Sequence, residues 1–122
     1  MITREMVDGV LEILLDGTRV LCVREQMKDD IFHMEAEGEI RNEVAHEFED
    51  ELMAAVSVCR KIRLDLSKIT YLASGALRSL LSVQQIIDEQ EGAEMILVHV
   101  SEPVMEALKE SGFDEILFIE ED

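Results

Sequence analysis

The stretch LDLSKITYLASGALR, residues 64–78, decides the fold of this chain. The segment KIRLDL at 61–66 overlaps the start of this stretch and alternates between polar and apolar residues, which predicts a partly buried strand. Residues 67–74 are mostly polar or small and are predicted to form a loop. A helix is predicted from Gly75 to about Gln90, ended by Gly92. Its apolar stripe consists of Leu77, Leu80, Leu81, Gln84 and Ile87.

On the N-terminal side, a second helix is predicted over residues 43–58. Apolar residues recur there every four positions, with Asn42 as the expected N-cap: Val44, Phe48, Leu52 and Val56. A strand is predicted at 31–36 and ended by Gly38. Earlier strands are predicted at 10–15 and 19–25, joined by an Asp16-Gly17 turn.

On the C-terminal side, the segment MILVHV at 95–100 is almost continuously apolar. This predicts a strand buried on both faces, with His99 as a core histidine. Ser101 is expected to cap a helix at 102–111, in which Pro103 is tolerated in the first turn. Gly112 ends that helix, and a last strand is predicted at 115–119.

The order of elements from residue 31 onward is therefore β-α-β-α-β-α-β. Strands that alternate with helices predict an α/β fold with a mainly parallel sheet. We expect a mixed sheet of about four to six strands, with the helices largely on one face. The 122 residues fit a single domain, 1–122, with N-terminal strands in 1–29 and a core in 30–120.

The charge of the chain limits its partners. Its 28 acidic and 11 basic residues give a formal net charge of −17. Such a chain is repelled by nucleic acids and by anionic membrane surfaces, so we expect neither partner. The start of the chain lacks an apolar leader, and no apolar run reaches the length of a membrane span, which favours a cytoplasmic protein without membrane insertion.

The bases are unevenly placed. Residues 60–78 hold five bases and one acid, whereas residues 29–59 hold ten acids and one base. This band is either a chance cluster of solvated side chains or a contact site for an anion or an acidic partner.

Ser74 is the most informative polar residue in the deciding stretch. It is the expected N-cap of the helix that follows, at the carboxyl end of a strand, where sites gather in α/β sheets. The free N–H groups and positive dipole end of a helix favour an anion. Ser74 is therefore either an ordinary capping serine or a site where an added phosphate would be stabilised.

The deciding stretch resembles the signature of STAS domains, the fold of the anti-sigma factor antagonists. That family shows an apolar strand with Leu-Asp-Leu-Ser, then an aromatic and an aliphatic residue, and Asp-Ser-Ser-Gly-Leu. The matching segments here are LDLS at 64–67 and YLASGAL at 71–77. Gly38-Glu39-Ile40 resembles the family's Gly-Glu-Leu, and residues 95–119 resemble its closing strand-helix-strand.

The resemblance implies a non-catalytic, protein-binding switch. Ser74 falls on the serine that the family phosphorylates, and the implied partner is an anti-sigma factor that resembles a serine kinase. The unmodified protein would bind this partner, and phosphorylation of Ser74 would break the complex. The candidate contacts are Ser67, Lys68, Thr70, Tyr71, Gly75, Arg78 and Ser79.

Some of these residues have simpler roles open to them. Tyr71 is either a contact or a core aromatic, and Arg78 and Ser79 are either contacts or solvated helix positions. The sequence also departs from the family pattern: Ala73 replaces Asp, Gly75-Ala76 replaces Ser-Gly, and Arg41 stands where Asp is common. The alternative is thus a STAS-like scaffold or ligand-sensing subunit of a transport or stress assembly, without phosphorylation.

Enzyme readings have little support in the sequence. Asp65 ends a strand, as the phosphoacceptor of a receiver domain does, but the expected lysine after the strand at 95–100 is replaced by Ser-Glu. Asp65 is expected to be hydrogen-bonded or to face water. His33, His46 and His99 share no metal-ligand spacing, although His33 and Glu35 lie on one strand face. We expect no cofactor and no metal.

Overall fold

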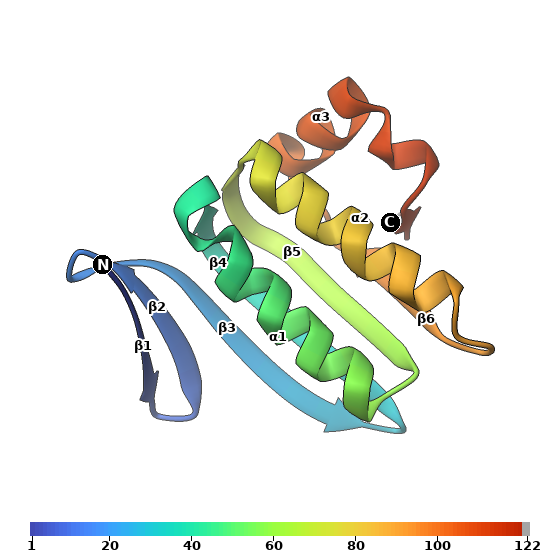
Figure 1. Ribbon diagram of the computed structural model, residues 1–122, viewed down its shortest axis with the longest axis horizontal. Helices are drawn as coiled ribbons and strands as arrows, with labels where there is room; N and C mark the ends of the chain where they lie inside the picture. The colour runs from blue at the N-terminus through green and yellow to red at the C-terminus, as the bar shows by residue number, and fades with distance from the viewer. Residues whose placement is uncertain (121–122) are drawn as a thin grey trace.

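The computed structural model describes residues 1–120 and contains a seven-stranded mixed sheet (Figure 1). The strands follow one another across the sheet in chain order: β1 (Ile2–Val7), β2 (Val10–Leu15), β3 (Thr18–Lys28), β4 (Ile31–Ile40), β5 (Lys61–Leu72), β6 (Glu94–Val98) and β7 (Phe118–Ile119). β1 to β4 pair antiparallel, and β4 to β7 pair parallel. The α/β class is confirmed, with more strands than the four to six expected.

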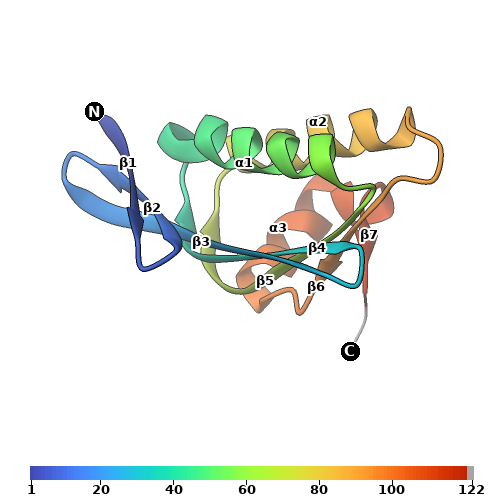
Figure 2. The same ribbon diagram turned by 90° about the horizontal axis from the view of Figure 1, so that it is seen from below.

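The parallel strands are connected by helices. These are α1 (Ala45–Val58), α2 (Ser74–Asp88) and α3 (Glu102–Ser111), with short 3₁₀ turns η1 (Asn42–Val44) and η2 (Phe113–Glu115). α1 and α2 lie side by side (Figure 1), and both cover the same face of the sheet (Figure 2). Alternate residues of β5 point into this layer and are at most 1% exposed: Ile62, Leu64 and Leu66. The buried side chains that alternate along β5 therefore pack against the apolar stripes of the helices.

The predicted stripe of the first helix is confirmed, because Val44, Phe48, Leu52 and Val56 are all buried. The stripe of α2 is rotated from the predicted one and consists of Ala76, Ser79, Leu80, Val83, Gln84 and Ile87. Leu77 and Leu81 are half-buried instead. The small side chains of Ala76 and Ser79 allow α2 to pack closely against α1.

The N-terminal hairpin contains a strand, β1, that was not predicted. Its burial is slight, since residues 3–7 are exposed, so ITREMV carries no period-two signal. Arg4 ties this strand to α1 through ion pairs with Glu47, at 3.8 Å, and with Glu51. The Asp16-Gly17 turn is confirmed, with positive φ at both residues.

The loop predicted at 67–74 is wrong, because β5 continues to Leu72. Its pairing with β4 is interrupted twice, so that extra residues of β5 bulge out around Leu66–Ser67 and at Thr70. These bulges break the alternation on which the prediction relied. Gly38 was expected to end the preceding strand but lies within β4, where φ is +119° and a Cβ would be 2.3 Å from the Val20 carbonyl oxygen.

At the C-terminal end, α3 packs against β5, and Ser101 precedes it as predicted. Ser101 is the N-cap residue of α3, but its hydroxyl donates to the Ile69 carbonyl at 2.7 Å and makes no capping hydrogen bond to the helix. The strand predicted at 115–119 is shortened to β7 by η2. One continuous core of buried side chains runs from Leu11 to Leu117. The last two residues of the expected 1–122 domain lie outside the described part.

Candidate functional site

Ser74 lies at the start of α2, where the carboxyl end of β5 meets η1. The predicted N-cap role is wrong: Ala73 is the N-cap, and Ser74 is the first residue of the helix. The side chain of Ser74 is exposed, and its hydroxyl has no hydrogen-bond partner within residues 1–120. Ser74 therefore presents an unengaged hydroxyl to solvent at the positive end of a helix.

A side chain from a distant segment caps α2. The Gly75 N–H donates to Asn42 Oδ1 at 2.7 Å, although Asn42 was expected to cap the helix at 43–58. A Cβ at Gly75 would lie 2.6 Å from the same oxygen, so a glycine at this position gives Asn42 room to reach the backbone. Sequence reasoning missed this contact because it joins residues 33 positions apart.

The ends of β4 and β5 hold the site in place. The Ala73 N–H donates to the Ile40 carbonyl at 2.9 Å. In the last pairs of the register, Tyr71 lies beside Glu39, which accepts a hydrogen bond from Arg41 at 2.8 Å. Tyr71 is 52% exposed and is therefore a surface residue, not a core aromatic.

Arg78 and Ser79 have different positions. Arg78 is exposed one turn after Ser74 and makes no ion pair in the described part of the chain. Ser79 is 3% exposed, and its hydroxyl donates to the Ala45 carbonyl at 3.2 Å. Ser79 therefore joins α1 to α2, and the prediction that it contacts a partner is wrong.

The remaining candidates lie on the bulged half of β5 and are exposed. Lys68 Nζ is 3.2 Å from Glu35 Oε1, on the sheet face opposite the helices. The Ser67 N–H donates to Asp65 Oδ1 at 2.8 Å, and Thr70 Oγ1 donates to the Gly38 carbonyl at 3.3 Å. The structure thus brings Tyr71, Ser74, Gly75 and Arg78 together and turns Lys68 away from them.

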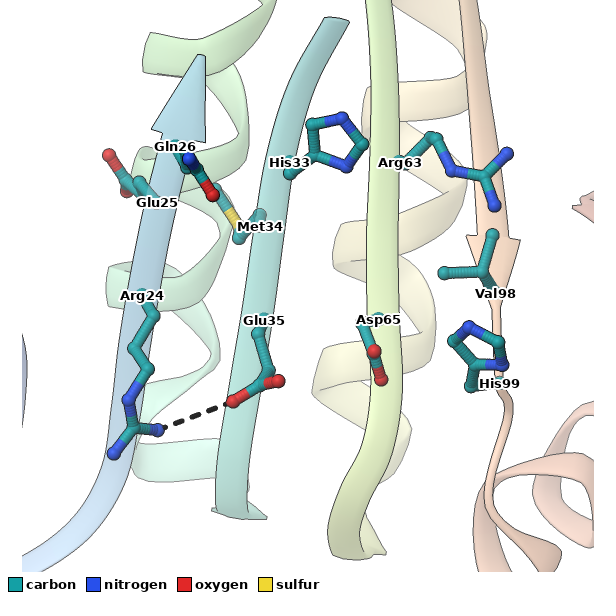
Figure 3. A pocket seen from close by; sticks show the side chains of 10 residues that line it. All are labelled: Arg24, Glu25, Gln26, His33, Met34, Glu35, Arg63, Asp65, Val98 and His99. Carbon is teal, nitrogen blue, oxygen red and sulfur yellow. Dashed lines mark hydrogen bonds and ion pairs between the residues drawn. The ribbon is translucent and has the colours of Figure 1, made fainter. Parts of the chain in front are cut away.

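The uncovered sheet face carries a shallow hollow of about 650 Å³ (Figure 3). It was not predicted, although alternating polar residues on β3, β4 and β5 signal a solvated face. The Arg24 guanidinium lies 3.4 Å from Glu35 Oε1, and the Arg63 guanidinium lies 2.9 Å from Glu120 Oε2. Both arginines of the lining are therefore paired with carboxylates, and Glu25 and Asp65 add two further acidic side chains to the hollow.

Asp65, His33 and His99 line the same hollow. Asp65 is hydrogen-bonded within β5, as expected. His99 is exposed and adopts a φ of +50° just after β6, so its predicted place in the core is wrong. Within residues 1–120, no three histidine, cysteine or acidic side chains are grouped to hold a metal ion.

The basic band at 60–78 does not form one contact surface. Arg60 donates to the Glu91 carbonyl at the opposite end of β5 from Ser74. Arg63 and Lys68 pair with acids on the uncovered face. Arg78 is the member of the band that stands beside Ser74. The interpretation as a single site for an acidic partner is therefore wrong.

Comparison with known proteins agrees with this architecture. A putative anti-sigma factor antagonist from Thermotoga maritima has a TM-score of 0.70 and 23% identity, over 82% of this chain and 86% of that chain. An anti-sigma factor antagonist from Mycobacterium paratuberculosis has a TM-score of 0.74 and 17% identity, over 84% and 86%. The phosphorylated Bacillus cell fate determinant SpoIIAA has a TM-score of 0.62 and 12% identity, over 82% and 92%. At these identities, the likeness shows a shared fold.

A sequence comparison with curated proteins found no significant match. In the described residues, no helix is both long and apolar enough to cross a membrane. The profile of the family described as "Mlab, STAS domain" matches residues 23–120, which is most of the sequence. The chain therefore belongs to the STAS domain family.

Proposed function

We propose that this chain is a regulatory protein-binding module that changes partners when Ser74 is phosphorylated. The unmodified surface at the start of α2 would bind an anti-sigma factor that resembles a serine kinase, in the cytoplasm. The observation that carries this proposal is the exposed, unengaged hydroxyl of Ser74 in the first turn of α2. It is further supported by the shared fold with the two anti-sigma factor antagonists from Thermotoga maritima and Mycobacterium paratuberculosis and with the phosphorylated form of SpoIIAA.

The physical effect of the modification follows from its charge. A phosphate adds about −1.5 to −2 charges and three acceptor oxygens at neutral pH. The helix end tolerates this charge while Ser74 faces water. A partner seated over Tyr71 and Arg78 would have to desolvate the phosphate, which costs binding energy unless the partner offers cations. Phosphorylation therefore weakens the complex more than it weakens the fold.

A second candidate is a STAS-like scaffold of a transport or stress assembly that works without phosphorylation. Ala73 favours it, because this residue is 3% exposed and supplies no carboxylate beside Ser74, where the family pattern has Asp. A scaffold of this kind would keep its partners whatever charge stands at position 74.

Affinity capture from the native host separates the two functions. The baits are the wild-type chain, Ser74→Glu and, as a matched control, Ser57→Glu, which changes an exposed serine at the far end of α1. The switch predicts that a kinase-like protein is recovered at least tenfold less with Ser74→Glu and equally well with Ser57→Glu, a change of about 1.4 kcal/mol. Equal recovery of every partner with all three baits would exclude the switch and support the scaffold function.

A further inference from the structure

The first turn of α2 has few hydrogen-bond donors left for a group attached to Ser74. The Ala76 N–H donates to the Ala73 carbonyl at 3.0 Å. The Gly75 N–H donates to Asn42 Oδ1 at 2.7 Å. Within residues 1–120, the N–H of Ser74 itself is the one in this turn that has no acceptor. A phosphate on Ser74 therefore meets a helix end whose central donor is already occupied.

Asn42 and a phosphate on Ser74 would seek the same donor. Phosphate oxygens are strong acceptors that gain from backbone N–H groups at a helix start. Asn42 Oδ1 is also an acceptor, and it lies so close to Gly75 that an added Cβ would be 2.6 Å away. Two acceptors, one of them anionic, cannot share this N–H without repulsion.

We infer that Asn42 is a positioning residue that competes with a phosphate on Ser74 for the Gly75 N–H. Phosphorylation then displaces the Asn42 side chain from α2. This inference rests on the modification site of the proposed function, but it does not depend on which partner binds.

The displacement acts on a segment next to the site. Asn42 is the first residue of η1, which leads directly into α1. Within residues 1–120, its contact with Gly75 is one of two hydrogen bonds that join η1 and the start of α1 to α2. The other is that of Ser79 with the Ala45 carbonyl. The modified protein therefore presents both a new charge and a released η1 turn, which a partner can distinguish from the unmodified surface.

The test uses the full chain with phosphoserine incorporated at position 74 during translation. It is compared with unmodified protein in three backgrounds: wild type, Asn42→Asp and Asn42→Ala. Asp keeps an accepting oxygen and adds a negative charge, whereas Ala removes the competitor. The change in Tm on phosphorylation should be most negative with Asp and most positive with Ala. We expect these extremes to differ by about 4 °C.

Two further measurements keep the test decisive. In the wild-type chain, NMR should show the Gly75 amide and the Asn42 side-chain amide shifting on phosphorylation, the latter toward solvent-exposed values. Phosphoserine at position 57, as a control, should change Tm equally in all three backgrounds. Equal Tm changes with phosphoserine at position 74, together with unmoved Gly75 and Asn42 signals, would overturn the inference. These experiments contain no partner protein, so a negative result would overturn the role of Asn42 without testing whether phosphorylation releases a partner.

Discussion

The two ends of β5 are built in different ways. The first half, up to Leu66, alternates regularly and sends Ile62, Leu64 and Leu66 into the core. The second half is bulged twice and is held by separate polar contacts, such as that of Thr70 with the Gly38 carbonyl. The regular half contributes three buried apolar side chains, whereas the irregular half buries Ile69 and Leu72 and also presents an exposed surface next to Ser74.

The largest effect is expected at the regular end. Leu64→Ala removes a side chain that is 0% exposed and should lower the free energy of unfolding by about 2–5 kcal/mol. Tyr71→Ala, at the irregular end, should lower it by less than about 1 kcal/mol, because Tyr71 is half exposed. Urea denaturation of both variants measures the difference. Equal losses would show that the two halves do not differ as described.

Two glycines next to the irregular half, Gly38 of β4 and Gly75 of α2, sharpen the comparison. Gly38→Ala places a Cβ against backbone at positive φ, so we expect a loss of at least about 2 kcal/mol. Gly75→Ala meets the movable side chain of Asn42. The loss of that cap, about 1 kcal/mol, is largely offset by the better helix propensity of alanine. Denaturation midpoints should therefore fall clearly for the first variant and little for the second.

The smallest effect is expected away from β5, where the N-terminal hairpin meets α1. Partial burial of its carboxyl and a hydrogen bond with Glu51 raise the pKa of Glu25 to about 7, against the opposing charge of Arg4. Folded protein then holds a proton that unfolded protein releases near pH 4.5, so stability falls as pH rises from about 4.5 to 7.

Glu25→Gln should abolish this decrease in the free energy of unfolding. The decrease in the wild type should be about 1 kcal/mol or less, because the carboxyl is partly exposed. Urea denaturation at pH 5, 6, 7 and 8 tests it against wild type. Leu64→Ala is the control, since it should lower stability by the same amount at every pH. A wild-type profile that is flat over this range would contradict the raised pKa.

Sequence reasoning succeeded where the pattern of burial is regular. The helix at 43–58, the alternating start of β5 and the order of the parallel core follow from apolar spacing, which local residues determine. It failed where tertiary contacts replace that spacing. Ser67 and Thr70 lie in or beside the bulges of β5, where the sequence lacks the alternation of a strand and predicted a loop. β1 forms a strand although almost none of its residues are buried.

The candidate site shows the same division. The resemblance pointed to the stretch around Ser74, and the structure places Tyr71 near the end of β5 and Gly75 and Arg78 in the first turns of α2. Their contact with a partner stays a prediction. Asn42 could not be placed there, because nothing in residues 42–75 indicates that their two ends meet. Ser79 could have been recognised as buried, since it lies three residues after Ala76 and four before Val83, on the stripe that faces α1.

The proposed switch at Ser74 depends on phosphate being attached to this residue in cells. The measurement is phosphate mapping by mass spectrometry on protein purified from growing and from starved cells of the native host. We expect phosphate on Ser74 in an amount that changes between the two states, with exposed Ser57 unmodified as an internal control. Unmodified Ser74 in both states, together with a Ser74→Glu variant that keeps every partner, would contradict it.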